Sequence, residues 1–183
     1  MNITVYCGSR MGNDPDFVTA AEELGQWIAA RGYGMVYGGG NVGLMGVIAD
    51  EVLAGGAPVT GVIPEFLIEA EKGHEGLHTL EVVQTMSQRK NRMLELGDAF
   101  LAMPGGTGTL EEIAEVMSLL KLQLHDKPCI FYNINGFYEP LRQMLQDMAG
   151  AGFLEEEDLD KIRFVRQPEE LEPILQPKKQ DRA

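Results

Sequence analysis

Cysteine and histidine are scarce in this sequence. Its 183 residues include two cysteines, Cys7 and Cys129, each in a short apolar run typical of a buried strand. They predict buried, reduced thiols and exclude a disulfide framework. The histidines, His74, His78 and His125, show no metal-ligand spacing, and neither a Ser-His-Asp arrangement nor a P-loop lysine is evident. No metal or cofactor is expected, and a hydrolytic reaction in this chain would use carboxylates and arginine.

Basic residues are also few. Lys and Arg number 15 against 28 Asp and Glu, which gives a formal net charge of −13. A field of that sign repels polyanions, so no nucleic-acid partner is expected, although backbone amides can still bind a small phosphate locally. An apolar run of about eighteen residues is missing, as is a basic, apolar leader, which predicts a cytoplasmic protein with no membrane partner.

Short apolar runs alternate with helical patterns along the chain. These patterns predict strands at 3–7, 35–37, 58–63, 80–83, 99–103, 129–132 and 162–165, with helices at 15–31, 44–54, 86–96, 111–124, 138–148 and 168–175. Continuous apolar strands, rather than alternating ones, indicate an α/β protein with a parallel sheet and helices on both faces. We expect a single domain over residues 1–175, followed by a polar, disordered tail at 176–183.

Glycine is plentiful, with 22 residues, and it gathers where three of the expected strands end. The three corners are Gly8-Ser9, Gly38–Gly46 and Gly105–Gly108. Tight turns need glycine on their own account, but nine glycines at three corners exceed what turning requires. Ligands bind beyond the carboxyl ends of parallel strands, so these corners predict a binding site.

The segment Pro104–Glu112 is the most informative of the three corners. Its glycines allow close backbone approach, and the unpaired amides at the start of the following helix favour an anion, so it is interpreted as a phosphate cradle. Thr109 and Glu112 have the spacing of a capping box, which would make that glutamate structural. Alternatively, Glu112 is a carboxylate beside the anion site, suited to activating water or stabilising a cationic transition state.

Two basic residues open the helix before the central strand. Thr85 and Gln88 predict a capping box at its start, and Arg89 and Lys90 follow. Alone, these cations would be a solvated helix face. Their position favours a role in the site, in which Arg89 pairs with Glu112 or binds a ligand phosphate.

The middle glycine loop allows a different interpretation. Gly38, Gly40 and Gly43 satisfy the dinucleotide pattern G-x-G-x-x-G, and Glu65 lies near the distance of a ribose-binding acid. However, the loop follows the second strand instead of the first, and Glu65 comes directly after a proline. A dinucleotide-dependent oxidoreductase is therefore the weaker hypothesis.

Three motifs in order resemble the signatures of the Lonely Guy family, long mislabelled as lysine decarboxylases. They are Gly38-Gly39-Gly40-Asn41-Val42-Gly43-Leu44-Met45-Gly46, Met86-Ser87-Gln88-Arg89-Lys90 and Pro104-Gly105-Gly106-Thr107-Gly108-Thr109-Leu110-Glu111-Glu112. The resemblance runs from about residue 3 to 164. It implies a Rossmann-like homodimer and a cytokinin riboside 5′-monophosphate phosphoribohydrolase, which cleaves the N-glycosidic bond of a purine nucleoside 5′-monophosphate, AMP included, into free base and ribose 5-phosphate.

The resemblance also implies roles for residues. Arg89 and Glu112 would be catalytic. The substrate-binding positions would be Ser9, Gly39, Gly40, Gly43, Glu71, Lys90, Gly105, Gly106, Thr107, Gly108, Thr109 and Glu111. Where many family members have serine, an aromatic residue and threonine, this chain has Arg10, Thr107 and Ser118, which leaves the preferred base open.

The same superfamily includes carriers of molybdenum cofactor, whose glycine loops hold a phosphate without breaking a bond. A non-catalytic nucleotide or molybdenum-cofactor carrier is therefore the alternative function. The presence of both Arg89 and Glu112 favours the enzyme.

Overall fold

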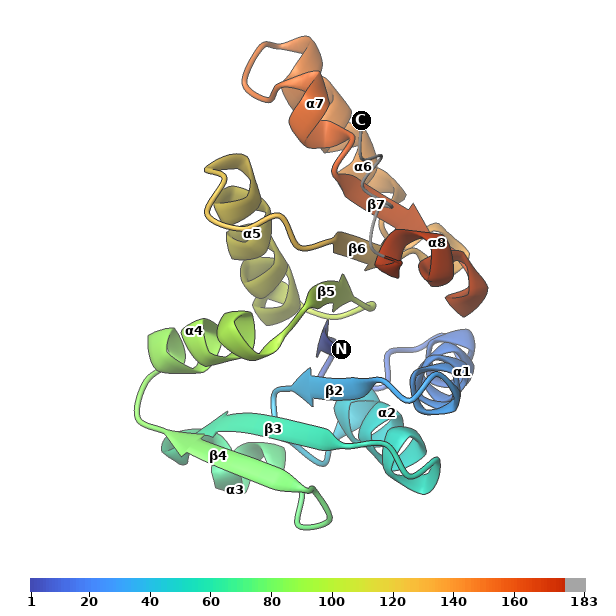
Figure 1. Ribbon diagram of the computed structural model, residues 1–183, viewed down its shortest axis with the longest axis vertical. Helices are drawn as coiled ribbons and strands as arrows, with labels where there is room; N and C mark the ends of the chain where they lie inside the picture. Colours follow the sequence, from blue (N-terminus) through green and yellow to red (C-terminus); the bar gives the residue numbers. More distant parts are fainter. Residues whose placement is uncertain (177–183) are drawn as a thin grey trace, which may run out of the picture.

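The computed structural model describes residues 1–176. The tail expected to be disordered, residues 176–183, lies outside the described residues apart from Gln176. The element order alternates strand and helix through most of the chain, as the apolar runs predict (Figure 1).

Seven strands form one sheet in the order β4-β3-β2-β1-β5-β6-β7, and every neighbouring pair is parallel. They are β1 (Asn2–Tyr6), β2 (Gly34–Tyr37), β3 (Val59–Pro64), β4 (Thr79–Val83), β5 (Ala99–Ala102), β6 (Cys129–Tyr132) and β7 (Ile162–Val165). Strands β2, β5 and β6 are buried along their whole length, and β1 is buried after Asn2, because helices cover both faces, which explains their continuous apolar sequence. The predicted parallel α/β sheet is confirmed.

The helices form two layers on the sheet (Figure 1). Side chains of α1, α2 and α8 share one apolar cluster with alternate strand residues, and side chains of α4, α5 and α6 share the other. Within β1, Ile3 and Val5 belong to the first cluster and Tyr6 to the second, as the two-residue period of a strand requires. The helices are α1 (Asp16–Ala30), α2 (Gly43–Ala54), α3 (Ile68–Glu71), α4 (Met86–Leu96), α5 (Thr107–Lys121), α6 (Glu139–Gly150), α7 (Glu156–Leu159) and α8 (Glu172–Leu175), with short 3₁₀ turns at Glu65–Leu67, Ile134–Gly136 and Pro168–Leu171.

Local signals fix several helix boundaries. The capping box predicted at the start of α4 is present: the Thr85 hydroxyl accepts from the Gln88 amide at 3.1 Å, and the Gln88 side chain accepts from the Thr85 amide at 3.2 Å. The predicted extension of α5 to residue 124 is wrong, because α5 ends at Lys121. His125 therefore lies in the following loop, where its ring contacts the Val116 carbonyl at 3.1 Å.

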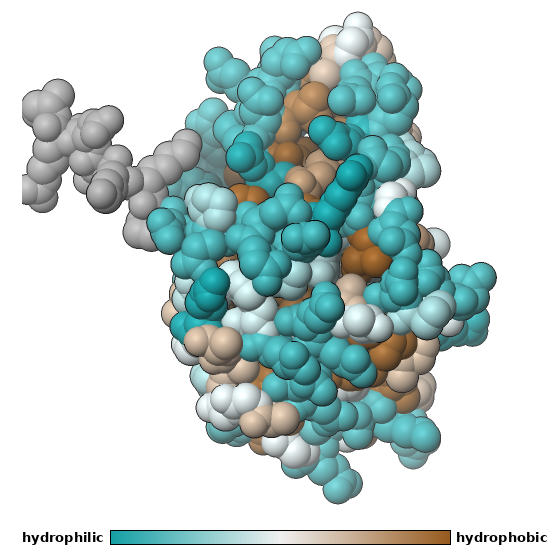
Figure 2. Space-filling view, turned by 90° about the vertical axis from the view of Figure 1, so that its right-hand side faces the viewer, coloured by the Kyte–Doolittle hydropathy of each residue, from teal (hydrophilic) through white to brown (hydrophobic). Residues whose placement is uncertain are grey.

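The two thiols are buried and free, as predicted. The side of the molecule that carries α1 and α8 has a mostly hydrophilic surface interrupted by a few apolar patches (Figure 2). No helix within residues 1–176 is long and apolar enough to cross a membrane.

Candidate active site

The strand order reverses between β1 and β5, and the glycine corners meet there. β1 lies between β2 and β5, so the chain leaves the carboxyl ends of these neighbouring strands in different directions, which is where parallel α/β sheets bind ligands. The Gly8 amide donates to the Pro104 carbonyl at 3.1 Å, and the Leu44 amide donates to the Gly8 carbonyl at 3.1 Å. All three predicted corners thus belong to one continuous surface.

The amino end of α5 is open. Its first residue is Thr107, its N-cap is Gly106, and no side chain caps it. A Cβ atom added to Gly106 or Gly108 would meet no atom within 4 Å. Neither backbone strain nor packing inside the described residues demands glycine at these two positions, so the uncapped amides can be approached closely from outside.

The capping box predicted for Thr109 and Glu112 is wrong. Because α5 starts at Thr107, both residues lie inside the helix, and the Thr109 side chain is buried. The Thr109 hydroxyl instead occupies the space beside Gly105, where an added Cβ would come within 2.1 Å of it. Glu112 is therefore not a capping residue.

Side chains and backbone from other segments pack closely against the middle glycine loop. A Cβ on Gly38 would lie 2.0 Å from the Arg89 guanidinium, and a Cβ on Gly40 would lie 3.0 Å from the Glu71 side chain. Gly43, with a φ of +58°, would meet the backbone of Ser9 at 2.3 Å. The loop thus carries an arginine and a glutamate on its surface. This crowding argues against a dinucleotide pyrophosphate over the same glycines.

Arg89 and Glu71 form a buried, incompletely bonded pair. The Arg89 side chain is 5% exposed, and its Nη2 donates to the Gly38 carbonyl at 3.1 Å and lies 3.6 Å from Glu71 Oε2. Arg89 Nε and Glu71 Oε2 are both buried without a hydrogen-bond partner. Burial raises the pKa of Glu71, and the Arg89 charge opposes that rise. Buried polar atoms without partners are uncommon, so a donor and an acceptor are available here to a bound ligand or a water molecule.

Glu112 lies in the same electrostatic environment. Its side chain is half-buried on α5, and burial raises its pKa from an ordinary 4.5 to about 7. The Arg89 charge lowers the pKa, while the carboxylates of Glu111 and Glu71 raise it further. A partly buried carboxyl whose pKa is raised toward neutrality, on a helix whose amino end is uncapped, is typical of active sites.

Lys90 joins the two helices of the site. Its Nζ contacts the carboxylate of Glu111 and lies 2.9 Å from Glu115 Oε2, so α4 and α5 are linked beside Arg89 and Glu112. The hydrogen bonds to these carboxylates raise the pKa of Lys90. Lys90 and Glu111, both predicted to bind substrate, are therefore bonded to each other in this structure.

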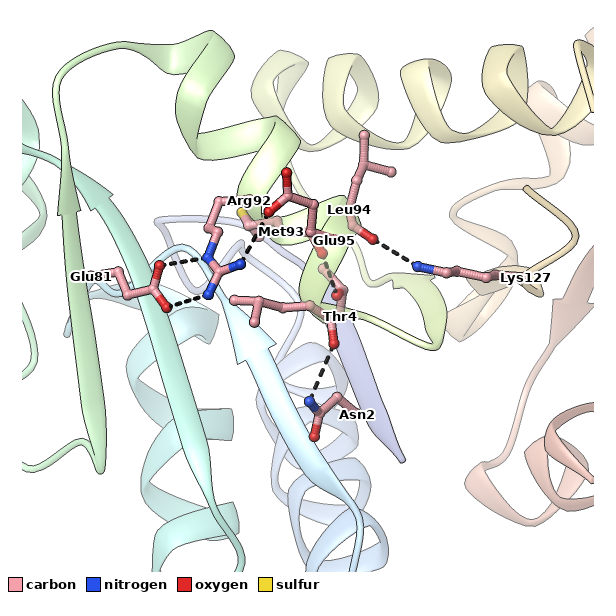
Figure 3. Close-up of polar contacts among 9 residues, drawn as sticks. Asn2, Thr4, Glu81, Arg92, Met93, Leu94, Glu95 and Lys127 are labelled. Carbon is pink, nitrogen blue, oxygen red and sulfur yellow. Dashed lines mark hydrogen bonds and ion pairs between the residues drawn. The ribbon is translucent and has the colours of Figure 1, made fainter. Parts of the chain in front are cut away.

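The far end of α4 is held by side chains from other elements (Figure 3). The Thr4 hydroxyl donates to the Met93 carbonyl at 3.1 Å, and Lys127 Nζ donates to the Leu94 carbonyl at 2.9 Å. Arg92 donates to both carboxylate oxygens of Glu81 on β4, at 2.7 and 3.0 Å. The Leu94 carbonyl is one that a helix end leaves unpaired, and together these contacts tie the helix that carries Arg89 to β1, to β4 and to the loop before β6.

The described residues hold no group of three or more His, Cys, Asp or Glu side chains that could bind a metal ion.

Known proteins match both the sequence and the fold. A family model described as "Possible lysine decarboxylase" matches residues 45–175. A probable cytokinin riboside 5′-monophosphate phosphoribohydrolase of Oryza sativa subsp. japonica is 45% identical over 152 residues, covering 83% of this chain and 68% of the relative. A cytokinin riboside 5′-monophosphate phosphoribohydrolase of Rhodococcoides fascians is 46% identical over 154 residues, covering 84% and 78%.

The chain belongs to the Lonely Guy family.

Solved structures agree on the fold of this Lonely Guy protein. The molybdenum cofactor binding protein from Rippkaea orientalis superimposes with a TM-score of 0.69 at 20% identity, over 95% of this chain and 93% of that one. The molybdenum cofactor carrier protein from Chlamydomonas reinhardtii gives a TM-score of 0.69 at 20% identity, over 95% and 97%. At this identity the likeness establishes the Rossmann-like fold alone.

The structure brings together most of the residues that the Lonely Guy resemblance singles out. Arg89, Glu71, Lys90 and Glu112 gather above the glycine corners, and α5 presents Gly106–Glu111 beside them. One expected pair is not formed: among residues 1–176, the ion pair of Arg89 is with Glu71, not with Glu112. Their catalytic and binding roles stay predictions.

Two residues with contacts near the candidate site were not predicted from the sequence. Glu115 lies one helical turn after Glu111, so its i, i+4 spacing on α5 could have placed both carboxylates near one cation. The second is His74, whose spacing from the other histidines does not fit a metal site. No sequence pattern around His74 indicates the contacts that its side chain makes.

Proposed function

We propose that the protein hydrolyses the N-glycosidic bond of a purine nucleoside 5′-monophosphate, either a cytokinin riboside 5′-monophosphate or AMP. The products are the free base and ribose 5-phosphate. The observation that carries this proposal is the placement of Glu112, with a pKa near 7, beside an uncapped helix terminus at the point where the strand order reverses. The activity named for relatives at 45% and 46% identity supports it.

The 5′-phosphate binds at the amino end of α5. The amides of Thr107, Gly108 and Thr109 lie in the first turn of a helix that has no side-chain cap, and the helix dipole adds to their attraction for an anion. Gly106 and Gly108 leave the approach free. The phosphate is thus an anchor, and its binding energy holds the ribose in place for reaction.

Glu112 acts where positive charge develops. As the base departs with the electrons of the glycosidic bond, the ribose gains oxocarbenium character, and an ionised Glu112 stabilises it and orients the attacking water. Water supplies the hydroxyl at the anomeric carbon and one proton, which offsets the proton taken up by the base. A pKa of about 7 keeps a substantial ionised fraction of Glu112 at neutral pH while letting it accept the water's proton.

Arg89 and Glu71 contribute binding and charge. The Arg89 guanidinium lowers the pKa of Glu112 and so favours its ionised form. The unpartnered Arg89 Nε and Glu71 Oε2 are a donor and an acceptor that ribose hydroxyls can satisfy. Both side chains rest on the Gly38–Gly40 loop, which gives those glycines a role in supporting the substrate.

The test is direct. The purified protein is incubated with AMP, with isopentenyladenosine 5′-monophosphate and with adenosine, and free base is measured by liquid chromatography. Release of base from a monophosphate but not from adenosine is expected, since adenosine lacks the anchoring phosphate. Cleavage of neither monophosphate, or full activity in the Glu112→Gln variant, contradicts the proposal.

We also propose that the protein is a cytoplasmic homodimer, which rests on the family resemblance. Exposed apolar side chains beyond α5 offer a surface for self-association: Leu122 is 66% exposed and Leu124 70%. Phe153, 78% exposed, belongs to the same region, because its carbonyl accepts from Lys121 Nζ at 3.1 Å. Sedimentation equilibrium of the wild type and of a Leu124→Glu variant tests this assembly.

A further inference from the structure

Residues 71–76 fold back onto the middle glycine loop. The Asn41 amide donates to the carbonyls of Glu71 and Lys72 at 2.8 and 2.9 Å, and the His74 amide donates to the Gly39 carbonyl at 2.9 Å. Gly40 and Gly73 form an antiparallel bridge between these bonds. A short two-stranded pairing therefore carries Glu71 to its place above Gly40.

The intrinsic stability of this segment is low. The helix before it, α3, has four residues, which is too short to be stable by itself. Lys72 ends that helix in the left-handed region at a φ of 48°, a conformation that a residue with a side chain rarely adopts. The position of Glu71 consequently depends on what holds residues 72–76.

The His74 side chain provides that hold. It is 6% exposed, its Nδ1 accepts from the Gly76 amide at 3.0 Å, and its Nε2 lies 3.0 Å from Asp50 Oδ1 on α2. With Nδ1 accepting, the ring proton is assigned to Nε2, which donates to the carboxylate. One imidazole thus closes the local turn and connects the segment to a helix of the core.

We propose that His74 is a positioning residue that, with Asp50, holds residues 71–76 against α2 and thereby keeps Glu71 beside Arg89. The inference deepens the proposed function and rests on it for its kinetic consequence. Glu71 Oε2 has no hydrogen bond of its own and lies 3.6 Å from Arg89 Nη2, so no strong contact of the carboxylate would restore its position if the segment moved.

The informative variant is Asp50→Ala, because that carboxylate is 67% exposed and its loss leaves the core intact. The matched control is Glu51→Ala, which removes the same charge from the next residue of α2. Within residues 1–176, the Glu51 carboxylate accepts a hydrogen bond from Gln26 alone. For AMP, Asp50→Ala is expected to raise KM about tenfold with kcat nearly unchanged, since a charge-assisted hydrogen bond is lost. Glu51→Ala is expected to leave both constants unchanged.

A second substitution tests whether the effect passes through Glu71. In a Glu71→Ala background, Asp50→Ala is expected to have no further effect on KM, whereas independent contributions would multiply. His74→Gln, which keeps a donor near the position of Nε2, is expected to retain more AMP affinity than His74→Ala.

Amide hydrogen exchange gives a readout that does not depend on activity. Asp50→Ala is expected to speed exchange at Asn41 and His74 about tenfold relative to Glu51→Ala, because their bonds join the two segments. Equal exchange in the two variants, or faster exchange with an unchanged KM, overturns the positioning role. A wild-type protein that cleaves no monophosphate refutes the proposed function instead, while the exchange experiment still decides whether His74 and Asp50 hold the segment.

Discussion

Replacing Glu112 by glutamine is expected to stabilise the protein while abolishing its activity. A carboxyl whose pKa is raised on folding holds its proton in the folded state at a pH where the unfolded chain has released it. Stability is therefore lost as the pH rises from 4.5, the ordinary pKa, to about 7, and glutamine, which does not ionise, escapes that loss.

The magnitude follows from the shift. Raising the pKa from 4.5 to about 7 corresponds to about 3 kcal/mol between the two protonation states. Glu112 is half-buried, and solvent screening reduces the realised effect. Between about pH 5.5 and about pH 8, a stability gain of about 1 to 2 kcal/mol over the wild type should develop. The lower pH of this comparison is above the pI of 4.6, at which the protein carries little net charge and is prone to associate.

Urea unfolding of both proteins at the two pH values measures the difference. Glu156→Gln, which removes an exposed carboxylate on α7, controls for the loss of one negative charge. The activity of Glu112→Gln on AMP should fall at least about a hundredfold, because its electrostatic stabilisation of the transition state is lost. A stability difference that does not change with pH would refute the assignment of a carboxyl with a raised pKa to this position.

Four further substitutions test other parts of the site. Gly108→Ala should stabilise α5 by about 0.5–1 kcal/mol, since its Cβ meets open space, yet raise the KM for AMP by obstructing the phosphate; thermal unfolding and kinetics measure the two effects. Gly38→Ala should instead displace Arg89 and lower both stability and kcat, because its Cβ would lie 2.0 Å from the guanidinium. Arg89→Met should shift the acid limb of the pH–rate profile to higher pH, since the arginine charge lowers the pKa of Glu112. Thr85→Ala should cost about 1 kcal/mol by removing the capping box of α4, measured by urea unfolding, and a loss below about 0.3 kcal/mol would contradict the importance of this cap.

The sequence predicts the sheet and the meeting of the glycine corners because both follow from local patterns. Continuous apolar runs reveal strands that are buried on both faces, and glycines mark the corners at their carboxyl ends. The structure begins α5 at Thr107, four residues before the start that the sequence pattern predicts, and the reason is also local. Gly106 and Gly108 have low helix propensity, so the pattern predicts a loop where the chain is already helical, and Thr109 then resembles a cap.

The contacts above the glycine loop could not be predicted, because they join segments distant in the sequence. Arg89 and Glu112 both bear charge and belong to the two helices flanking β5, which makes their pairing a natural expectation. The structure pairs Arg89 with Glu71 because residues 71–74 form backbone hydrogen bonds to residues 39–41. Neither segment has a periodic sequence pattern that predicts this pairing.

Because of the contacts at the far end of α4, substitutions distant from the candidate site are expected to change the position of Arg89. Seven residues separate Arg89 from Leu96, a length of about 10 Å along the helix axis, so a tilt of roughly 5° about the fixed end moves the arginine by roughly 1 Å. Displacements of about 1 Å can cost about a hundredfold in rate. Lys127, whose ammonium group bonds the Leu94 carbonyl, is therefore expected to influence the placement of Arg89 although it contacts the opposite end of the helix.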